Sequence, residues 1–131
     1  MNEIKSLLLK IYRNLHFLDS VYFDFQKCIF KEDEYDFSLF CKPEKDYIRN
    51  INQEFYQILL QEKIILDILL SESMDFTAIK FCTSKLMEIL IHLLLVLNVH
   101  SPVNFCVFDF SETKEIMQQT FEFCNEIDKI T

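Results

Sequence analysis

The stretch from residue 4 to residue 29, IKSLLLKIYRNLHFLDSVYFDFQKCI, decides the fold class. Its large apolar residues recur at alternating spacings of four and three, which is the repeat of one face of an α-helix. Charged and polar residues, His16 among them, fall on the opposite side. The pattern predicts an amphipathic helix of about 28 residues. The apolar stripe consists of Ile4, Leu8, Ile11, Leu15, Leu18, Tyr22, Phe25 and Ile29.

Three further helices are predicted downstream of the first. Pro43 suits the first position of one of them, because proline lacks the N–H that a helix leaves unpaired there. The predicted ranges are residues 43–70, 76–99 and 112–129. Four long helices joined by short connections predict an all-α four-helix bundle or a close variant of one, in a single domain that covers residues 1–131.

The ends of the later helices carry their own signals. Ser73 or Asp75 is the expected N-cap of the third helix, and Ser111 is the expected N-cap of the last one, since side-chain oxygens at such positions accept the unpaired backbone N–H groups. Between these helices, residues 103–110 (VNFCVFDF) are expected to form a short strand or an extended connector.

The chain contains no glycine in its 131 residues. Phosphate-cradling loops, dinucleotide-binding turns and nucleophile elbows need glycine where the backbone approaches a ligand or turns sharply. Enzymes that depend on these loops, turns or elbows are therefore excluded. The absence agrees with helices, whose interiors disfavour glycine, and we expect any activity to lie on helix faces.

The charge balance indicates the kind of partner. With 21 acidic and 13 basic residues, the net charge of −8 argues against direct binding to nucleic acid or to anionic membranes. The longest uncharged stretch, residues 89–108, has a purely apolar centre of only about ten residues, too short to span a bilayer. No signal peptide is evident, so we expect a cytoplasmic protein and a protein partner with a basic surface.

The cysteines predict a reducing compartment. The count is odd, the spacings are long and no Cys-x-x-Cys pair occurs, which is typical of reduced, buried thiols rather than of a disulfide framework. The five are Cys28, Cys41, Cys82, Cys106 and Cys124.

Two acidic groups are the candidate partner-binding residues. The first group, here named the acidic stripe, is spaced 3, 4, 3 and 4 along the last helix, so its members fall within about 80° of one another over a length of about 20 Å. The stripe is either a docking face for a basic partner or an ordinary solvated face opposite a buried one. The second group lies in the predicted loop before Pro43, and it lacks the glycine that a calcium-binding EF-hand loop requires. The stripe is Glu112, Glu115, Gln119, Glu122 and Glu126, and the loop group is Glu32, Asp33, Glu34 and Asp36.

Other clusters offer weaker chemistry. Glu88 and His92 are four residues apart, whereas the Glu-x-x-His motif of di-iron bundles has a spacing of three and occurs twice. His100, Cys106 and Asp109 lie close together in sequence, but the apolar neighbours of Cys106 indicate a buried and inert thiol. We therefore expect no catalytic residues, no metal and no cofactor.

These patterns favour a small acidic, non-enzymatic protein that binds a protein partner. Inhibitors, immunity proteins, antitoxins and viral or phage anti-defence proteins provide the analogy. The alternative is a structural or regulatory subunit that forms a homodimer through residues 89–97, which are apolar almost all round the helix, or through the first helix. A helical-bundle enzyme or metal protein is the third alternative.

Overall fold

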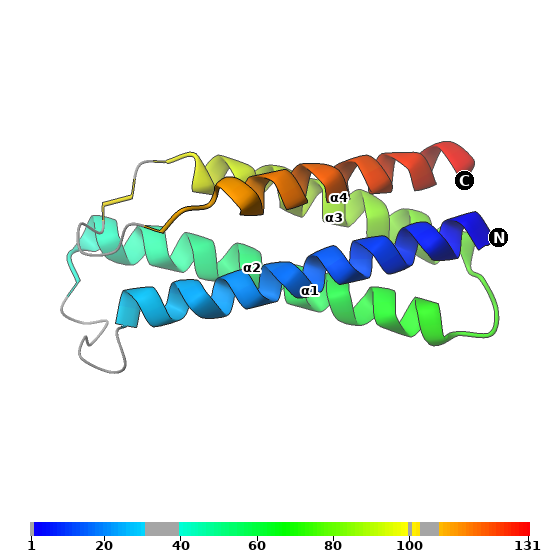
Figure 1. Cartoon of the computed structure of the whole chain (residues 1–131), viewed down its shortest axis with the longest axis horizontal. Helices are drawn as coiled ribbons and strands as arrows, with labels where there is room; N and C mark the ends of the chain where they lie inside the picture. The colour runs from blue at the N-terminus through cyan, green and yellow to red at the C-terminus, as the bar shows by residue number, and fades with distance from the viewer. Residues whose placement is uncertain (1, 31–39, 100, 103–107) are drawn as a thin grey trace.

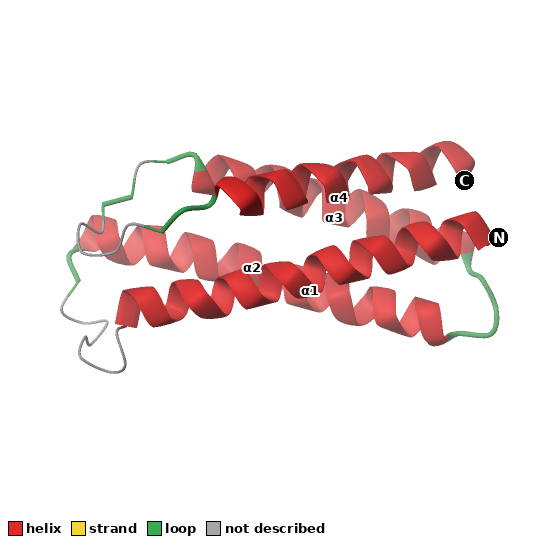
Figure 2. Cartoon of the chain, in the orientation of Figure 1, coloured by secondary structure: helices red, strands yellow, loops and turns green. Residues whose placement is uncertain are grey.

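Four α-helices make up almost all of the computed structural model, which describes residues 2–30, 40–99, 101–102 and 108–131. The helices are α1 (Asn2–Phe30), α2 (Lys42–Leu70), α3 (Phe76–Leu97) and α4 (Ser111–Ile130). The described residues contain no strand, as Figure 2 shows. The predicted all-α four-helix bundle is confirmed.

The helices run alternately up and down and form a ring (Figure 1). Each helix packs against two others, since α1 contacts α2 and α4, and α3 contacts the same two. The helices that face each other diagonally across the bundle have little or no contact. This arrangement leaves one long side of every helix exposed to solvent.

The predicted stripe of α1 supplies one wall of the core. Seven of its eight members are buried, and Leu8, Ile11, Leu15 and Leu18 have no exposed surface. Each such side chain contributes roughly 1.5–3 kcal/mol through removal of apolar surface from water. Tyr22 is half-buried, and its hydroxyl donates a hydrogen bond of 2.9 Å to Asn52 Oδ1 on α2.

Asp75 is the N-cap of α3, which confirms one of the two residues, Ser73 and Asp75, that were predicted for this position. Its carboxylate accepts the backbone N–H groups of Thr77 and Ala78 at 3.1 and 3.2 Å. The prediction for α4 is wrong: Ser111 is the first helical residue, and its N–H and hydroxyl both donate to Asp109 Oδ1, at 2.9 and 2.7 Å. The hydroxyl of Ser111 is therefore engaged by the preceding carboxylate instead of capping the helix.

The connection that leads into α4 is anchored to the core. The rings of Phe108 and Phe110 lie 5.8 and 5.7 Å from the ring of Phe25 on α1. Residues 103–107 of the predicted strand or connector are outside the described residues, and residues 108–110 form no strand. No described helix is both long enough and apolar enough to cross a membrane.

The cysteines depart from the prediction. Cys82 and Cys124 are buried free thiols, and burial raises their pKa values to about 11 and about 12. Cys41 is a free thiol, as predicted, but it is exposed, so the expected burial is wrong for Cys41. Cys28 is disulfide-bonded, so the expected reduced state is wrong for Cys28. Spacing along the sequence does not reveal which cysteines a folded bundle brings together. Cys106 lies outside the described residues.

Candidate functional site

The acidic stripe lies on the solvent side of α4. All five members are exposed, while the opposite side of the helix is buried against α1 and α3. Among the described residues, no basic side chain forms an ion pair with Glu112, Glu115, Glu122 or Glu126. Gln119 accepts a hydrogen bond of 3.1 Å from Asn14 on α1. The carboxylates of the stripe are thus free to meet positive charge from outside.

An apolar groove between α3 and α4 meets the stripe at Glu115. Its volume is about 430 Å³, and its floor is formed by apolar side chains from both helices. Glu115 of the stripe also lines the groove, together with Lys114 and Gln118. The groove therefore joins an apolar surface to a negatively charged one. The apolar lining residues are Leu90, Ile91, Leu94, Met117 and Phe121.

α3 exposes apolar side chains both inside the groove, at Ile91, and outside it, at Leu95. Leu95 is 62% exposed and Ile91 is 48% exposed, although Leu90 and Leu93 on the same helix belong to the core. The apolar residues that surround this helix are thus divided between the core and the solvent. Continuous exposed apolar surface is typical of a binding face.

The remaining predicted clusters give no site within the described residues. Glu88 and His92 are both exposed, and Glu88 lies 3.9 Å from Lys85 Nζ. The loop group Glu32, Asp33, Glu34 and Asp36 is outside the described residues, as are His100 and Cys106. Asp109 is described, and its carboxylate accepts the two hydrogen bonds from Ser111.

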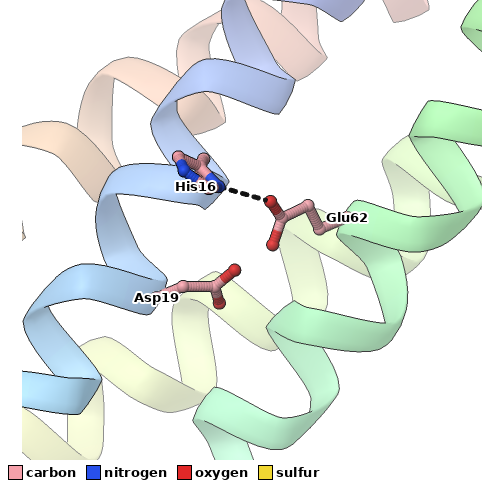
Figure 3. A group of neighbouring side chains, drawn as sticks. All are labelled: His16, Asp19 and Glu62. Atoms are coloured by element: carbon pink, nitrogen blue, oxygen red, sulfur yellow. Dashed lines mark hydrogen bonds and ion pairs between the residues drawn. The ribbon is translucent and has the colours of Figure 1, made fainter.

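The structure brings together a polar cluster that the sequence analysis did not predict. His16 and Asp19 lie one turn apart on α1 and point toward Glu62 of α2 (Figure 3). His16 Nδ1 is 3.1 Å from Glu62 Oε1, and one ligand atom from each of the three residues lies within 4.8 Å of the other two. We name these three residues the α1–α2 cluster.

Burial makes this cluster unusual. Glu62 is only 6% exposed, and its Oε2 atom is buried without a hydrogen-bond donor. The carboxyl group of Asp19 faces it (Figure 3), and burial together with the neighbouring Glu62 raises the pKa of Asp19 to about 8. Two ionised carboxylates cannot hydrogen-bond to each other, so the contact needs a shared proton or a cation.

One sequence signal for the cluster was present. Glu62 occupies a position in the apolar repeat of α2, because residues 55, 58, 62 and 65 are spaced 3, 4 and 3. A charge in that repeat is buried, and buried charges need partners. The identity of its partners depends on how α2 is aligned along α1, which the sequence does not show.

Comparison with other proteins adds no functional information. No protein-family model, no curated protein sequence and no solved structure matches this chain.

Proposed function

We propose that the protein is a binding module that docks onto a basic, amphipathic segment of a protein partner. The carrying observation is that Glu115 belongs both to the acidic stripe and to the lining of the apolar groove. A helix with apolar residues on one side and Lys or Arg next to them matches both surfaces at once. Lys114 also lines the groove and would repel a positive charge placed there. We therefore expect the positive charge of the partner to lie over the stripe rather than over the groove.

This proposal assigns the protein to the broad class of inhibitors and antitoxin-like proteins that act by occupying a partner. The function needs no catalytic group or cofactor. We also propose a cytoplasmic location, although a disulfide bond such as that of Cys28 is uncommon there. The net charge of −8 disfavours direct binding to nucleic acid, because the phosphate backbone repels an acidic surface. A basic surface that itself binds nucleic acid or acidic substrates is a suitable target.

Charge reversal tests the proposal. The full chain, immobilised, is used to capture proteins from cells of its source, in parallel with Glu115→Lys/Glu122→Lys and with a control variant, Asp67→Lys/Glu72→Lys, whose exposed acids lie elsewhere. We expect one basic protein to be retained by the wild type and the control, to be lost from the stripe variant, and to elute as salt is raised. Equal retention by all three proteins refutes the role of the stripe.

A designed peptide gives the same test without the natural partner. A labelled helix of about 18 residues of Lys and Leu with segregated faces is titrated against each protein, and a scrambled peptide of equal composition serves as control. We expect the segregated peptide to bind the wild type about tenfold more tightly than the stripe variant at low salt, a difference of about 1.4 kcal/mol. If the scrambled peptide binds equally well, the groove plays no part.

Self-association through α3 is the second candidate function. The exposed side chains of Ile91, Leu94 and Leu95 favour it, because a second copy would remove them from water. α1 offers less, since its exposed large apolar residues are Leu9 and Phe23, which lie two turns or more apart.

Light scattering at tens of micromolar protein distinguishes this candidate. We expect a dimer that Leu95→Lys converts to monomer, while Leu70→Lys, at a residue that is 74% exposed on α2, leaves the dimer intact. A strict monomer in the wild type excludes the candidate.

A further inference from the structure

We propose that His16, Asp19 and Glu62 bind a divalent transition-metal ion that links α1 to α2. The proposal is independent of the acidic stripe and of the apolar groove, since the α1–α2 cluster lies on other helices. It rests on the convergence of three potential ligands from two helices and on the unpaired oxygen that the cluster encloses.

The spacing of the ligand atoms suits an ion. Adjacent ligand atoms around an ion with bonds of about 2.1 Å lie roughly 3.0–3.4 Å apart. His16 Nδ1 and Glu62 Oε1 are already 3.1 Å apart. The other separations in the cluster are at most 4.8 Å, which is within about 2 Å of that range, and Asp19 is only half-buried.

The unpaired oxygen points to a ligand. Glu62 is more than nine-tenths buried, and its Oε2 atom has no hydrogen-bond donor. An unsatisfied buried carboxylate oxygen costs more than almost any other polar group, unless a cation or a proton neutralises it. Figure 3 shows Oε2 on the side of Glu62 that faces Asp19. A bound ion would satisfy this oxygen and would neutralise both carboxylates.

The donor set selects the kind of ion. One imidazole nitrogen and two carboxylate oxygens suit Zn²⁺, Mn²⁺ and their neighbours, whereas Mg²⁺ and Ca²⁺ prefer oxygen alone. Three protein ligands leave at least one coordination position for water. The side chain of His16 is 73% exposed, so that position faces solvent. Asp19 also lines a pocket of about 290 Å³ between α1 and α2.

Titration of the full chain, free of tag and stripped with chelator, tests the site. Zn²⁺ binding is measured by calorimetry, and Co²⁺ binding by its visible absorption, which reports the ligand field directly. We expect one ion per chain, a melting temperature that rises with Zn²⁺ concentration, and competition between Zn²⁺ and Co²⁺. Mg²⁺ and Ca²⁺ are expected to compete at least tenfold less effectively.

Variants locate the ion. His16→Gln, Asp19→Asn and Glu62→Gln are each expected to weaken Zn²⁺ binding by about tenfold or more and to remove the Co²⁺ absorption. His16→Gln is the safest variant for folding, because the side chain is mostly exposed. The matched controls Asp24→Asn on α1 and His92→Gln on α3 alter exposed residues outside the cluster and are expected to bind as the wild type does.

Two results would overturn the proposal. One is the absence of saturable binding at roughly 100 µM Zn²⁺, a concentration that detects even a weak site. The other is binding that survives in His16→Gln and Asp19→Asn, or that His92→Gln abolishes, because the ion would then lie elsewhere. In either case the carboxylate pair is held by a shared proton, and the stripe and groove of the proposed function are unaffected.

Discussion

Replacement of Asp19 by asparagine is predicted to stabilise the metal-free protein at alkaline pH. Asp19 and Glu62 face each other at the α1–α2 interface, and burial and the charge of Glu62 raise the pKa of Asp19 to about 8. The asparagine side chain would carry no charge, and its amide would be able to donate a hydrogen bond to the unpaired Glu62 Oε2. The wild type achieves the same contact only when Asp19 is protonated.

The sign and size of the effect follow from the pKa. The folded pKa of about 8 lies above the ordinary value of 3.8, so the folded state holds a proton that the unfolded state loses. This contribution to stability is fully present below about pH 4 and is lost as the pH rises to about 8. The shift corresponds to at most about 5–6 kcal/mol. Because Asp19 is only half-buried and water screens its charge, we expect about 1–2 kcal/mol.

Thermal unfolding in the presence of a chelator measures the effect. At about pH 8.5, where Asp19 is mostly ionised in the wild type, Asp19→Asn should raise the melting temperature by about 3–10 °C. At about pH 5 the gain should be less than roughly a third of that value, because pH 5 lies less than a third of the way from the ordinary pKa of 3.8 to the folded pKa of about 8. Asp24→Asn, at an exposed residue of α1, controls for the loss of one negative charge. A gain that is equal at both pH values, or a loss at the higher one, would refute the reasoning.

Three further predictions concern packing and reactivity. Phe25→Ala should lower the free energy of unfolding by about 3–5 kcal/mol in urea titrations, since Phe25 is 1% exposed, whereas Phe23→Ala, at 60% exposure, should cost less than about 1 kcal/mol. Asn14→Ala removes the two hydrogen bonds that join α1 to α4, and it should cost about 1–2 kcal/mol and speed amide exchange in α4; unchanged exchange would contradict the role of that contact. A thiol reagent at about pH 8 should label Cys41 at once and Cys124 only after denaturation, because burial raises the pKa of Cys124 to about 12. Identification of the labelled peptides by mass spectrometry checks this order.

The fold could be predicted from the sequence wherever the apolar repeat within a single helix was enough to show which side of that helix is buried. The α1 stripe needed no knowledge of its neighbours, because apolar spacing alone fixes which side of a helix is buried. Exposure of the acidic stripe followed in the same way from the spacing between Glu112 and Glu126. The cap of α4 did not, because the N-cap position falls on Phe110, whose side chain cannot accept a hydrogen bond, and the sequence does not show at which residue the helix begins.

Features that depend on two helices were beyond the sequence. The apolar repeat places His16 on the polar side of its helix, and it is exposed there, yet its Nδ1 reaches the buried Glu62 on another helix. To predict that contact, one must know the position of α2 along α1 to within one helical turn. The same limit applies to the groove, whose lining combines Leu94 of α3 with Phe121 of α4.

The ring in which the four helices pack has a consequence for how the chain is made. α4 lies between α3 and α1, and the diagonal helices have little or no contact that would hold a partial bundle together. A nascent chain that has emerged only through α3 therefore presents two open apolar seams to water, one on each side of the missing helix. The core can be completed only after α4 has left the ribosome, and until then those seams are the surfaces on which a chaperone would act.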